Sequence, residues 1–179
     1  IPRKKDIYYY KREIKIAKKD KILCAKYRKG HFEGVIDVMD RFTKIIQPKK
    51  IFMGEKDFQQ LYLVENYLKK RSTSKIIRCK TVRDNYSLAL SSRNLLLKNK
   101  ELKIARHISK NLINFRKKLE KKRNIKNLIN LKKKEINELK NVKVEYLEIR
   151  NKLSLKKSLN IKNSKIFIAY YIKKIRLID

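Results

Sequence analysis

The feature that most constrains the fold is the succession of segment types between residues 49 and 80. The apolar segment "KKIFM" (49–53) has the pattern of a short buried strand, and "SKIIRC" (74–79) has that of a second strand. Between them lies a helical pattern of apolar residues, formed by Leu61, Leu63, Val64, Tyr67 and Leu68. A strand, a helix and a strand joined by short loops predict a βαβ unit, and therefore an α/β fold with a parallel sheet.

A further helix is predicted just before this unit. In "HFEGVIDVMDRFTKIIQ" (31–47) the apolar residues recur at helical spacing, and Pro48 ends the pattern. The predicted apolar face consists of Val35, Ile36, Val38, Met39, Phe42, Ile45 and Ile46. Residues 1–29 are rich in Lys and Tyr and show only weak amphipathic character.

The character of the sequence changes after Thr81. A polar loop is followed by two Lys-rich amphipathic segments, 99–118 and 122–140, which predict helices. Three strands are predicted after them, at "VKVEYLEI" (142–149), "KIFIAYYI" (165–172) and "IRLID" (175–179). Helices followed by strands favour a small α+β domain, so we divide the chain into residues 1–80 and 81–179.

The charge of the chain is strongly positive, with 51 Lys and Arg against 17 Asp and Glu, a formal net charge of +34. Such an excess usually indicates an anionic partner, either nucleic acid or an acidic membrane surface. Here the excess is mostly Lys, accompanied by many Ile, Asn and Tyr, whose codons are A/T-rich. Because the lysines are spread over the whole chain, we favour codon drift and regard nucleic acid as an unlikely partner.

Other compositional signals are weak. Cys24 and Cys79 are isolated, which favours inert thiols in a reducing compartment, and His31 and His107 are too scattered to predict a metal site. No apolar run approaches the roughly 20 residues of a membrane helix, and no signal-peptide pattern is visible. The sequence starts with Ile1, as a fragment or a processed product would.

The junction "GEKD" lies where ligands bind in α/β folds, between a parallel strand and the next helix. Gly54 allows close backbone approach, Lys56 can supply a charge to a phosphate, and Asp57 can accept from sugar hydroxyls. The alternative is that Asp57 only caps the helix and Lys56 is solvent-exposed. Gln59 and Gln60 follow on the first helical turn, and either one of them faces the mouth of the sheet or both form an exposed polar pair.

The segment "LSSRN" (90–94) is a second candidate, in a loop that we expect to be mobile. The hydroxyls of Ser91 and Ser92 can donate to phosphate oxygens, and Arg93 can bind a phosphate bidentately. The alternative is that Ser91 or Ser92 caps a helix that begins at "RNLLLK".

Together these segments resemble the pantothenate synthetase (pantoate–β-alanine ligase) family. The resemblance rests on "RKGHFEGV" (28–35), "QPKKIFMGEKDFQQLYLV" (47–64) and "TVRDNYSLALSSRNLLL" (81–97), and more loosely on "VEYLEIRN" (144–151) and "RLID" (176–179). It implies a partial Rossmann-like sheet of the nucleotidyl-transferase type in residues 1–80 and an α+β lid domain in 81–179. It also implies an ATP-dependent and Mg²⁺-dependent ligase that joins pantoate to β-alanine through pantoyl-adenylate, as a cytoplasmic homodimer.

The resemblance also assigns site residues. For the ATP site it implies Gly54, Glu55, Lys56, Asp57, Val82, Leu90, Ser91, Ser92 and Arg93, of which Lys56, Ser91, Ser92 and Arg93 would have catalytic roles. For pantoate it implies Gln60, with His31 near the pocket.

The sequence departs from the family pattern in three respects. It has no HxGH motif, which in the family binds the ATP phosphates, since His31 and His107 are its only histidines. In addition, Tyr86 and Ser87 replace a pair of the Asp/Asn-Gly type, and Lys29 replaces a proline. Three readings remain: a fragment that is inactive alone, a decayed remnant without catalysis, and a basic nucleic-acid-binding protein.

Overall fold

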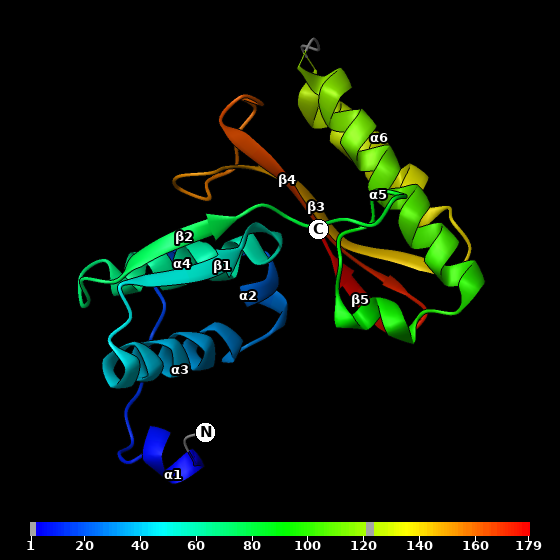
Figure 1. Cartoon of the computed structure of the whole chain (residues 1–179). Coiled ribbons are helices and arrows are strands. Elements are labelled where there is room, and N and C mark those ends of the chain that lie inside the picture. Colours follow the sequence, from blue (N-terminus) through cyan, green and yellow to red (C-terminus); the bar gives the residue numbers. More distant parts are fainter. Residues whose placement is uncertain (1–2, 121–123) are drawn as a thin grey trace. The chain divides into compact units, whose positions relative to one another are not determined.

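The computed structural model describes residues 3–120 and 124–179, which form two compact units, Ile1–Lys80 and Thr81–Asp179 (Figure 1). The first unit contains a two-stranded parallel sheet and the second a three-stranded antiparallel sheet. The prediction of an α/β chain with a parallel sheet is therefore confirmed. Among the described residues, no helix combines the length and the apolar character needed to span a membrane.

The first unit is built around the predicted βαβ arrangement. Its elements are β1 (Lys50–Gly54), the 3₁₀ turn η2 (Glu55–Asp57), α4 (Phe58–Leu68) and β2 (Lys75–Cys79). The two strands run parallel, with Ile51 opposite Ile76. Since α4 connects them, the carboxyl end of β1 leads directly into the amino end of this helix.

Helix α4 covers one face of the sheet. Its predicted apolar residues Leu61, Leu63, Val64 and Leu68 are buried. On this face, Arg78 of β2 forms an ion pair with Glu65 of α4 at 2.5 Å. Phe52 of β1 belongs to the opposite face and is 67% exposed. Since parallel sheets are usually covered on both faces, the Phe52 face is an unusual surface within the described part of the chain.

The predicted helix before the sheet is α3 (His31–Ile46), which packs against α4 (Figure 1). Ile36 of its predicted apolar face is buried, but Ile45 and Ile46 are 47% and 65% exposed, so their predicted burial is wrong. They lie in the last turn, which ends at the left-handed Gln47. The buried surface of the helix is completed instead by polar residues, among them Arg41.

Residues 3–29 form three short helical segments, α1 (Lys4–Ile7), η1 (Lys18–Asp20) and α2 (Cys24–Tyr27). Two arginines tie this segment to α3. Arg41 donates to the carbonyls of Ile7 and Tyr10, at 3.0 and 2.9 Å, and Arg12 donates to the Asp37 carboxylate. Hydrogen bonds from charged guanidinium groups therefore hold this segment against α3.

The second unit consists of two helices on a three-stranded sheet. Its elements are η3 (Ser92–Leu96), α5 (Asn99–Leu119), α6 (Ile125–Asn137), β3 (Val142–Asn151), β4 (Ser164–Ile172) and β5 (Ile175–Ile178). The strand order is β3-β4-β5, so β4 is central and β5 is an edge strand. The predicted start of the second helix at residue 122 lies outside the described residues. Its predicted end at residue 140 is wrong, because the chain turns after Asn137 through the left-handed Asn141.

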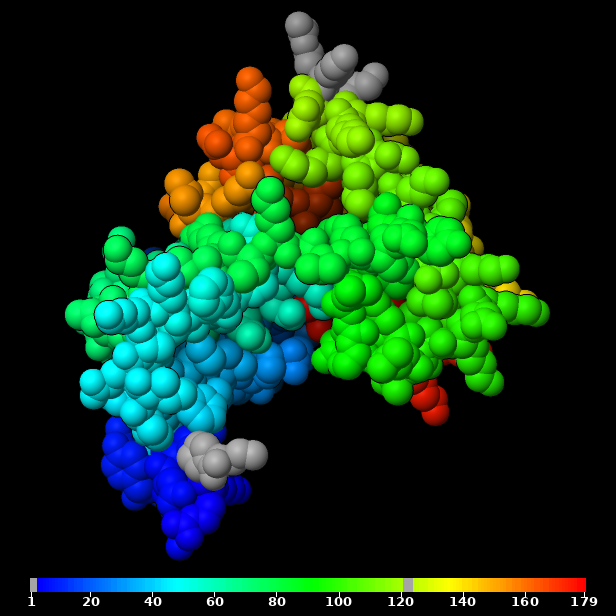
Figure 2. Space-filling model, viewed as in Figure 1, coloured from blue at the N-terminus to red at the C-terminus, as the bar shows by residue number. Residues whose placement is uncertain are grey.

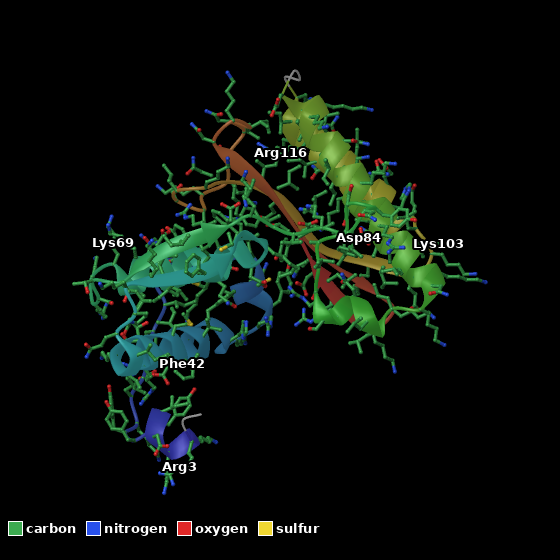
Figure 3. All side chains as sticks on the ribbon, in the orientation of Figure 1. Arg3, Phe42, Lys69, Asp84, Lys103 and Arg116 are labelled. Carbon is green, nitrogen blue, oxygen red and sulfur yellow. The ribbon has the colours of Figure 1, made fainter. Side chains whose placement is uncertain are left out.

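The helices and the sheet share one hydrophobic core. Ile108 and Leu112 of α5 and Ile136 of α6 are buried against Ile168 and Tyr170 of β4. The lysines of α5 take the opposite side of the helix, as Lys103 shows by extending away from the ribbon (Figure 3). The amphipathic pattern of the sequence therefore places the positive charge of α5 on its solvent face.

Strand β3 contains a β-bulge opposite the central strand. Val144 pairs with Tyr170 and Tyr146 pairs with Ala169, which leaves Glu145 as the extra residue. A bulge locally changes the direction in which a side chain points.

Candidate functional site

The segment Gly54–Asp57 lies at the carboxyl end of β1 and forms a 3₁₀ turn that continues into α4. Lys56 is only 18% exposed, so the alternative in which it is a solvated lysine is wrong. Asp57 occupies the N-cap position of α4, but its side chain makes no capping hydrogen bond and is half-exposed. The Nζ atom of Lys56 lies 3.9 Å from the Asp57 carboxylate. One cation and one exposed carboxylate therefore lie at the amino end of a helix, where the helix dipole favours anions.

The two glutamines of the first turn of α4 have different environments. Gln59 is 5% exposed, and its amide donates to the carbonyls of Asp20 (3.1 Å) and Ile22 (2.7 Å) and accepts from the N–H of Ala25 (3.4 Å). Gln60 is half-buried, and its amide has no hydrogen bond within the described residues. The reading of both glutamines as an exposed polar pair is therefore wrong. Gln59 joins α4 to the segment around α2, whereas the described residues leave the hydrogen-bonding groups of the Gln60 amide unused.

His31 is the first residue of α3, directly after the left-handed Gly30. Its ring centroid lies 5.0 Å from that of Phe32, whose side chain is buried. His31 therefore belongs to the same unit as the Gly54–Gln60 segment, at the amino end of a different helix.

The second candidate segment, in the other unit, is held as a turn and not as a free loop. Arg83 and Ala89 form an antiparallel bridge, and the N–H of Leu90 donates to the carbonyl of Val82 at 3.0 Å. Val82 and Leu90 themselves are 67% and 52% exposed. Ser87 closes the turn with φ of 75°, a left-handed conformation that costs an L-residue energy.

The side chain of Asp84 stabilises this turn through three hydrogen bonds. Its Oδ1 atom accepts from the N–H groups of Tyr86 and Leu88, both at 2.9 Å, and its Oδ2 atom accepts from Arg106 at 2.7 Å. Burial alone would raise the pKa of Asp84, but these hydrogen bonds outweigh it and hold the pKa below its ordinary value. Figure 3 shows Asp84 beside α5, the helix that carries Arg106.

The "LSSR" part of the segment forms the start of η3. The Ser91 hydroxyl accepts from the N–H of Arg93 at 3.3 Å, so the prediction that Ser91 caps a helix is confirmed for this 3₁₀ helix. Ser92 is exposed, and Arg93 donates from Nη1 to the carbonyl of Arg176 at 3.1 Å. The hydroxyl hydrogen of Ser91 and most of the Arg93 N–H groups remain available to an anion.

The surface around η3 is partly apolar. Leu95 and Leu96 are 87% and 66% exposed, although they belong to an ordered 3₁₀ helix. The green surface of this part of the chain is visible in Figure 2. The expected mobile loop is therefore a defined element, in which Ser92, Leu95 and Leu96 are exposed and Ser91 and Arg93 are half-buried.

Sequence analysis missed the ion pair that fixes the start of this segment. The guanidinium of Arg83 binds the carboxylate of Asp179 bidentately, at 2.6 and 2.7 Å. The hydrogen bonds that Arg83 donates to Asp179 raise the pKa of Arg83, although burial opposes this shift. The "RLID" segment has a family resemblance, but no sequence spacing predicts a pair between residues 83 and 179.

A cavity of about 710 Å³ in the first unit does not include any of the predicted site residues. It is lined by Asp40, Thr43, Lys44, Gln47 and residues 69–73. It lies at the carboxyl ends of α3 and α4, near Lys69 in Figure 3, at the other end of α4 from Gln60. Lysines at helix carboxyl ends complement the helix dipole, and Lys44 also pairs with Asp40 at 3.1 Å.

Within residues 3–120 and 124–179, no group of three or more His, Cys, Asp or Glu side chains could hold a metal ion.

Comparisons with known proteins agree on one family. A family model described as pantoate-beta-alanine ligase matches residues 1–179. The pantothenate synthetase of Clostridium botulinum is 36% identical over 160 residues, which are 88% of this chain and 57% of that protein. The chain thus spans less than two thirds of this relative's length.

Two solved structures are also similar to this chain. Pantothenate synthetase from Thermus thermophilus has a TM-score of 0.87 at 23% identity, over 98% of this chain and 65% of that one, which shows a shared fold. Pantoate-beta-alanine ligase from Francisella tularensis, complexed with beta-gamma ATP and beta-alanine, has a TM-score of 0.76 at 32% identity, over 98% of this chain and 60% of that one.

The contrast between the two glutamines predicts opposite effects on stability. We expect Gln59→Ala to lower the free energy of unfolding by about 1–3 kcal/mol, because it leaves buried backbone groups without partners. Gln60→Ala should change it by less than about 0.5 kcal/mol, as is typical of partly exposed sites without structural bonds. Urea denaturation of both variants tests this, and equal losses would contradict the assignment of Gln59 as the structural residue.

The left-handed Ser87 predicts a stabilising substitution. A left-handed L-residue costs roughly 1–2 kcal/mol, and glycine loses about 0.5–1 kcal/mol in entropy, so Ser87→Gly should raise the unfolding free energy by about 0.5–1 kcal/mol. Ser158→Gly, at a position without positive φ, is the control and should be neutral or destabilising. A lower melting temperature for Ser87→Gly would show that the turn is not strained.

Proposed function

Because this chain belongs to the pantoate–β-alanine ligase family, we propose that the protein that carries it condenses pantoate with β-alanine at the expense of ATP. The observation that carries the proposal is the junction at the carboxyl end of β1, where Lys56 and the open amide of Gln60 lie on one short segment. In α/β folds, this is the edge of the sheet at which ligands bind.

We infer that the reaction proceeds in two steps. The carboxylate of pantoate attacks the α-phosphorus of ATP and displaces pyrophosphate, which yields pantoyl-adenylate. The amine of β-alanine then attacks the activated carbonyl, and AMP leaves. Both steps move negative charge onto phosphate oxygens, so fixed cations and N–H donors are the groups that accelerate them.

The two candidate segments supply such groups. The amino end of α4 and Lys56 suit the phosphates of ATP, whereas Asp57, whose carboxylate is half-exposed, suits a sugar hydroxyl. Arg93 can bind a phosphate through the N–H groups that Arg176 does not use, and the hydroxyls of Ser91 and Ser92 can donate to the same oxygens. By resemblance to the family, Gly54 and Glu55 of the first unit and Val82 and Leu90 of the second are also proposed to bind ATP.

The proposed pantoate site centres on Gln60, with His31 nearby. Pantoate carries a carboxylate and hydroxyls, and an amide can donate to the first and accept from the second. The amide of Gln59 is occupied by the backbone of residues 20–25, so only Gln60 can fulfil this role.

We infer from the family resemblance that ATP binds as its Mg²⁺ complex. The family resemblance further favours a cytoplasmic homodimer that does not bind nucleic acid or membranes.

The proposal predicts specific losses at the ATP site. We expect Lys56→Ala and Arg93→Ala each to lower kcat/KM for pantothenate formation about 100-fold or more, because each removes a group aimed at charge that develops in the transition state. Lys103→Ala, which removes an equal charge from the solvent face of α5, is the control and should have no effect. AMP release measures all three. Equal losses would show that net charge and not a site is responsible, and no activity without substitution would favour the remnant reading.

The proposal also predicts a selective effect at the pantoate site. Gln60→Ala should weaken pantoate binding about tenfold or more, since an unpaired polar group costs roughly 1–3 kcal/mol, and should leave ATP binding nearly unchanged. Titration calorimetry with each substrate separates the two effects. An equal loss for both substrates would place Gln60 outside the pantoate site.

A further inference from the structure

The edge strand β5 contacts both ends of residues 83–93, which include the turn at Ser87 and most of the second candidate segment (90–94). Asp179, directly after β5, binds Arg83, and the carbonyl of Arg176 accepts from Arg93. Both contacts lie within the second unit. The orientation of the Arg93 guanidinium therefore depends on the position of the Arg176 carbonyl in β5.

The position of that carbonyl is fixed by the side chain of the same residue. Arg176 binds the carboxylate of Glu145, with Nη2–Oε2 at 2.5 Å and Nε–Oε2 at 3.2 Å. Both side chains are nearly buried, at 12% and 11% exposure. The pair extends across the central strand β4 and so joins β3 directly to β5.

Glu145 can make this contact because of its place in β3. It is the extra residue of the β-bulge between Val144 and Tyr146, and a bulge changes the direction of a side chain. Strand β5 has only four residues and has no strand partner on its outer edge within the described chain. A strand this short depends on side-chain anchors for its exact placement.

We propose that Glu145 is a positioning residue for Arg93: through Arg176 it fixes the β5 carbonyl that orients the Arg93 guanidinium. The inference rests on the proposed function in one respect, namely that Arg93 meets the phosphates of ATP. Loss of the Glu145 charge leaves the buried Arg176 without this counter-charge, so β5 shifts and the guanidinium loses its fixed direction. The ATP site is then less preorganised although none of its own residues has changed.

The test compares Glu145→Gln with Glu148→Gln in the protein that carries this chain. Glu148 is a matched control, because it lies on the same strand and also binds an arginine, Arg150, at 2.5 Å, but among the described residues it forms no ion pair with β5 or Arg93. Side-chain NMR of the Arg93 Nε–H group reports its order without ATP. The affinity for ATP is then measured for each variant, with and without Arg93→Ala.

We expect Glu145→Gln to lower the order of the Arg93 side chain and to raise the Kd for ATP about tenfold. In the Arg93→Ala background it should raise the Kd less than about twofold, because the effect passes through Arg93. Glu148→Gln should change neither quantity. If Glu145→Gln does not fold, Glu145→Asp keeps the charge with a shorter reach and should give the same effects at smaller size.

An equal effect of Glu145→Gln in both backgrounds, or an Arg93 side chain as ordered as before, would overturn the inference and leave Glu145 a merely structural residue. If Arg93→Ala alone does not change the Kd for ATP, the proposed function of this segment fails. The NMR result still decides in that case whether Glu145 orients Arg93.

Discussion

The parallel pairing of β1 with β2 is the constraint on which the candidate ligand site depends. Two neighbouring parallel strands need a crossover, and α4 supplies it within a single segment. The crossover places the amino end of α4 at the carboxyl end of β1, so Lys56 and Gln60 lie together at that edge. The same arrangement turns Gln59 inward, where it joins α4 to residues 20–25.

In the second unit, ion pairs that are partly or nearly buried position the second candidate segment and the turn before it. The chain has 17 acidic residues against 51 basic ones, and several of the acids lie at structural anchors. Asp84 holds Arg106, Asp179 holds Arg83, and Glu145 holds Arg176. Buried pairs add little net stability, since desolvation offsets their attraction, but they are strongly directional. Here they orient the segment that carries the proposed phosphate ligands.

Much of the architecture could be predicted from the sequence, because helix and strand periods are local signals. The segments 49–53 and 74–79 are strands, the pattern at 31–47 is a helix that ends before Pro48, and the three C-terminal strands exist. The failures have tertiary causes. Ile45 and Ile46 follow the helical period, yet within the described residues nothing packs on the last turn of α3 to bury them. The second helix of the other unit ends early because of the turn at Asn141.

The sequence by itself determined the βαβ order, the family resemblance and the residue types at the two candidate segments. These depend on neighbours in the chain, on periodicity and on motif. Only the tertiary structure decided which glutamine is structural, because residues 20–25, far from Gln59 in the sequence, supply its partners. It also decided that Arg93 donates to the carbonyl of Arg176 in β5, and that the side chain of Arg176 binds Glu145 of β3, since both contacts join residues distant in the sequence. Contacts between distant residues leave no local pattern, and for that reason the anchors of the site could not be predicted from the sequence.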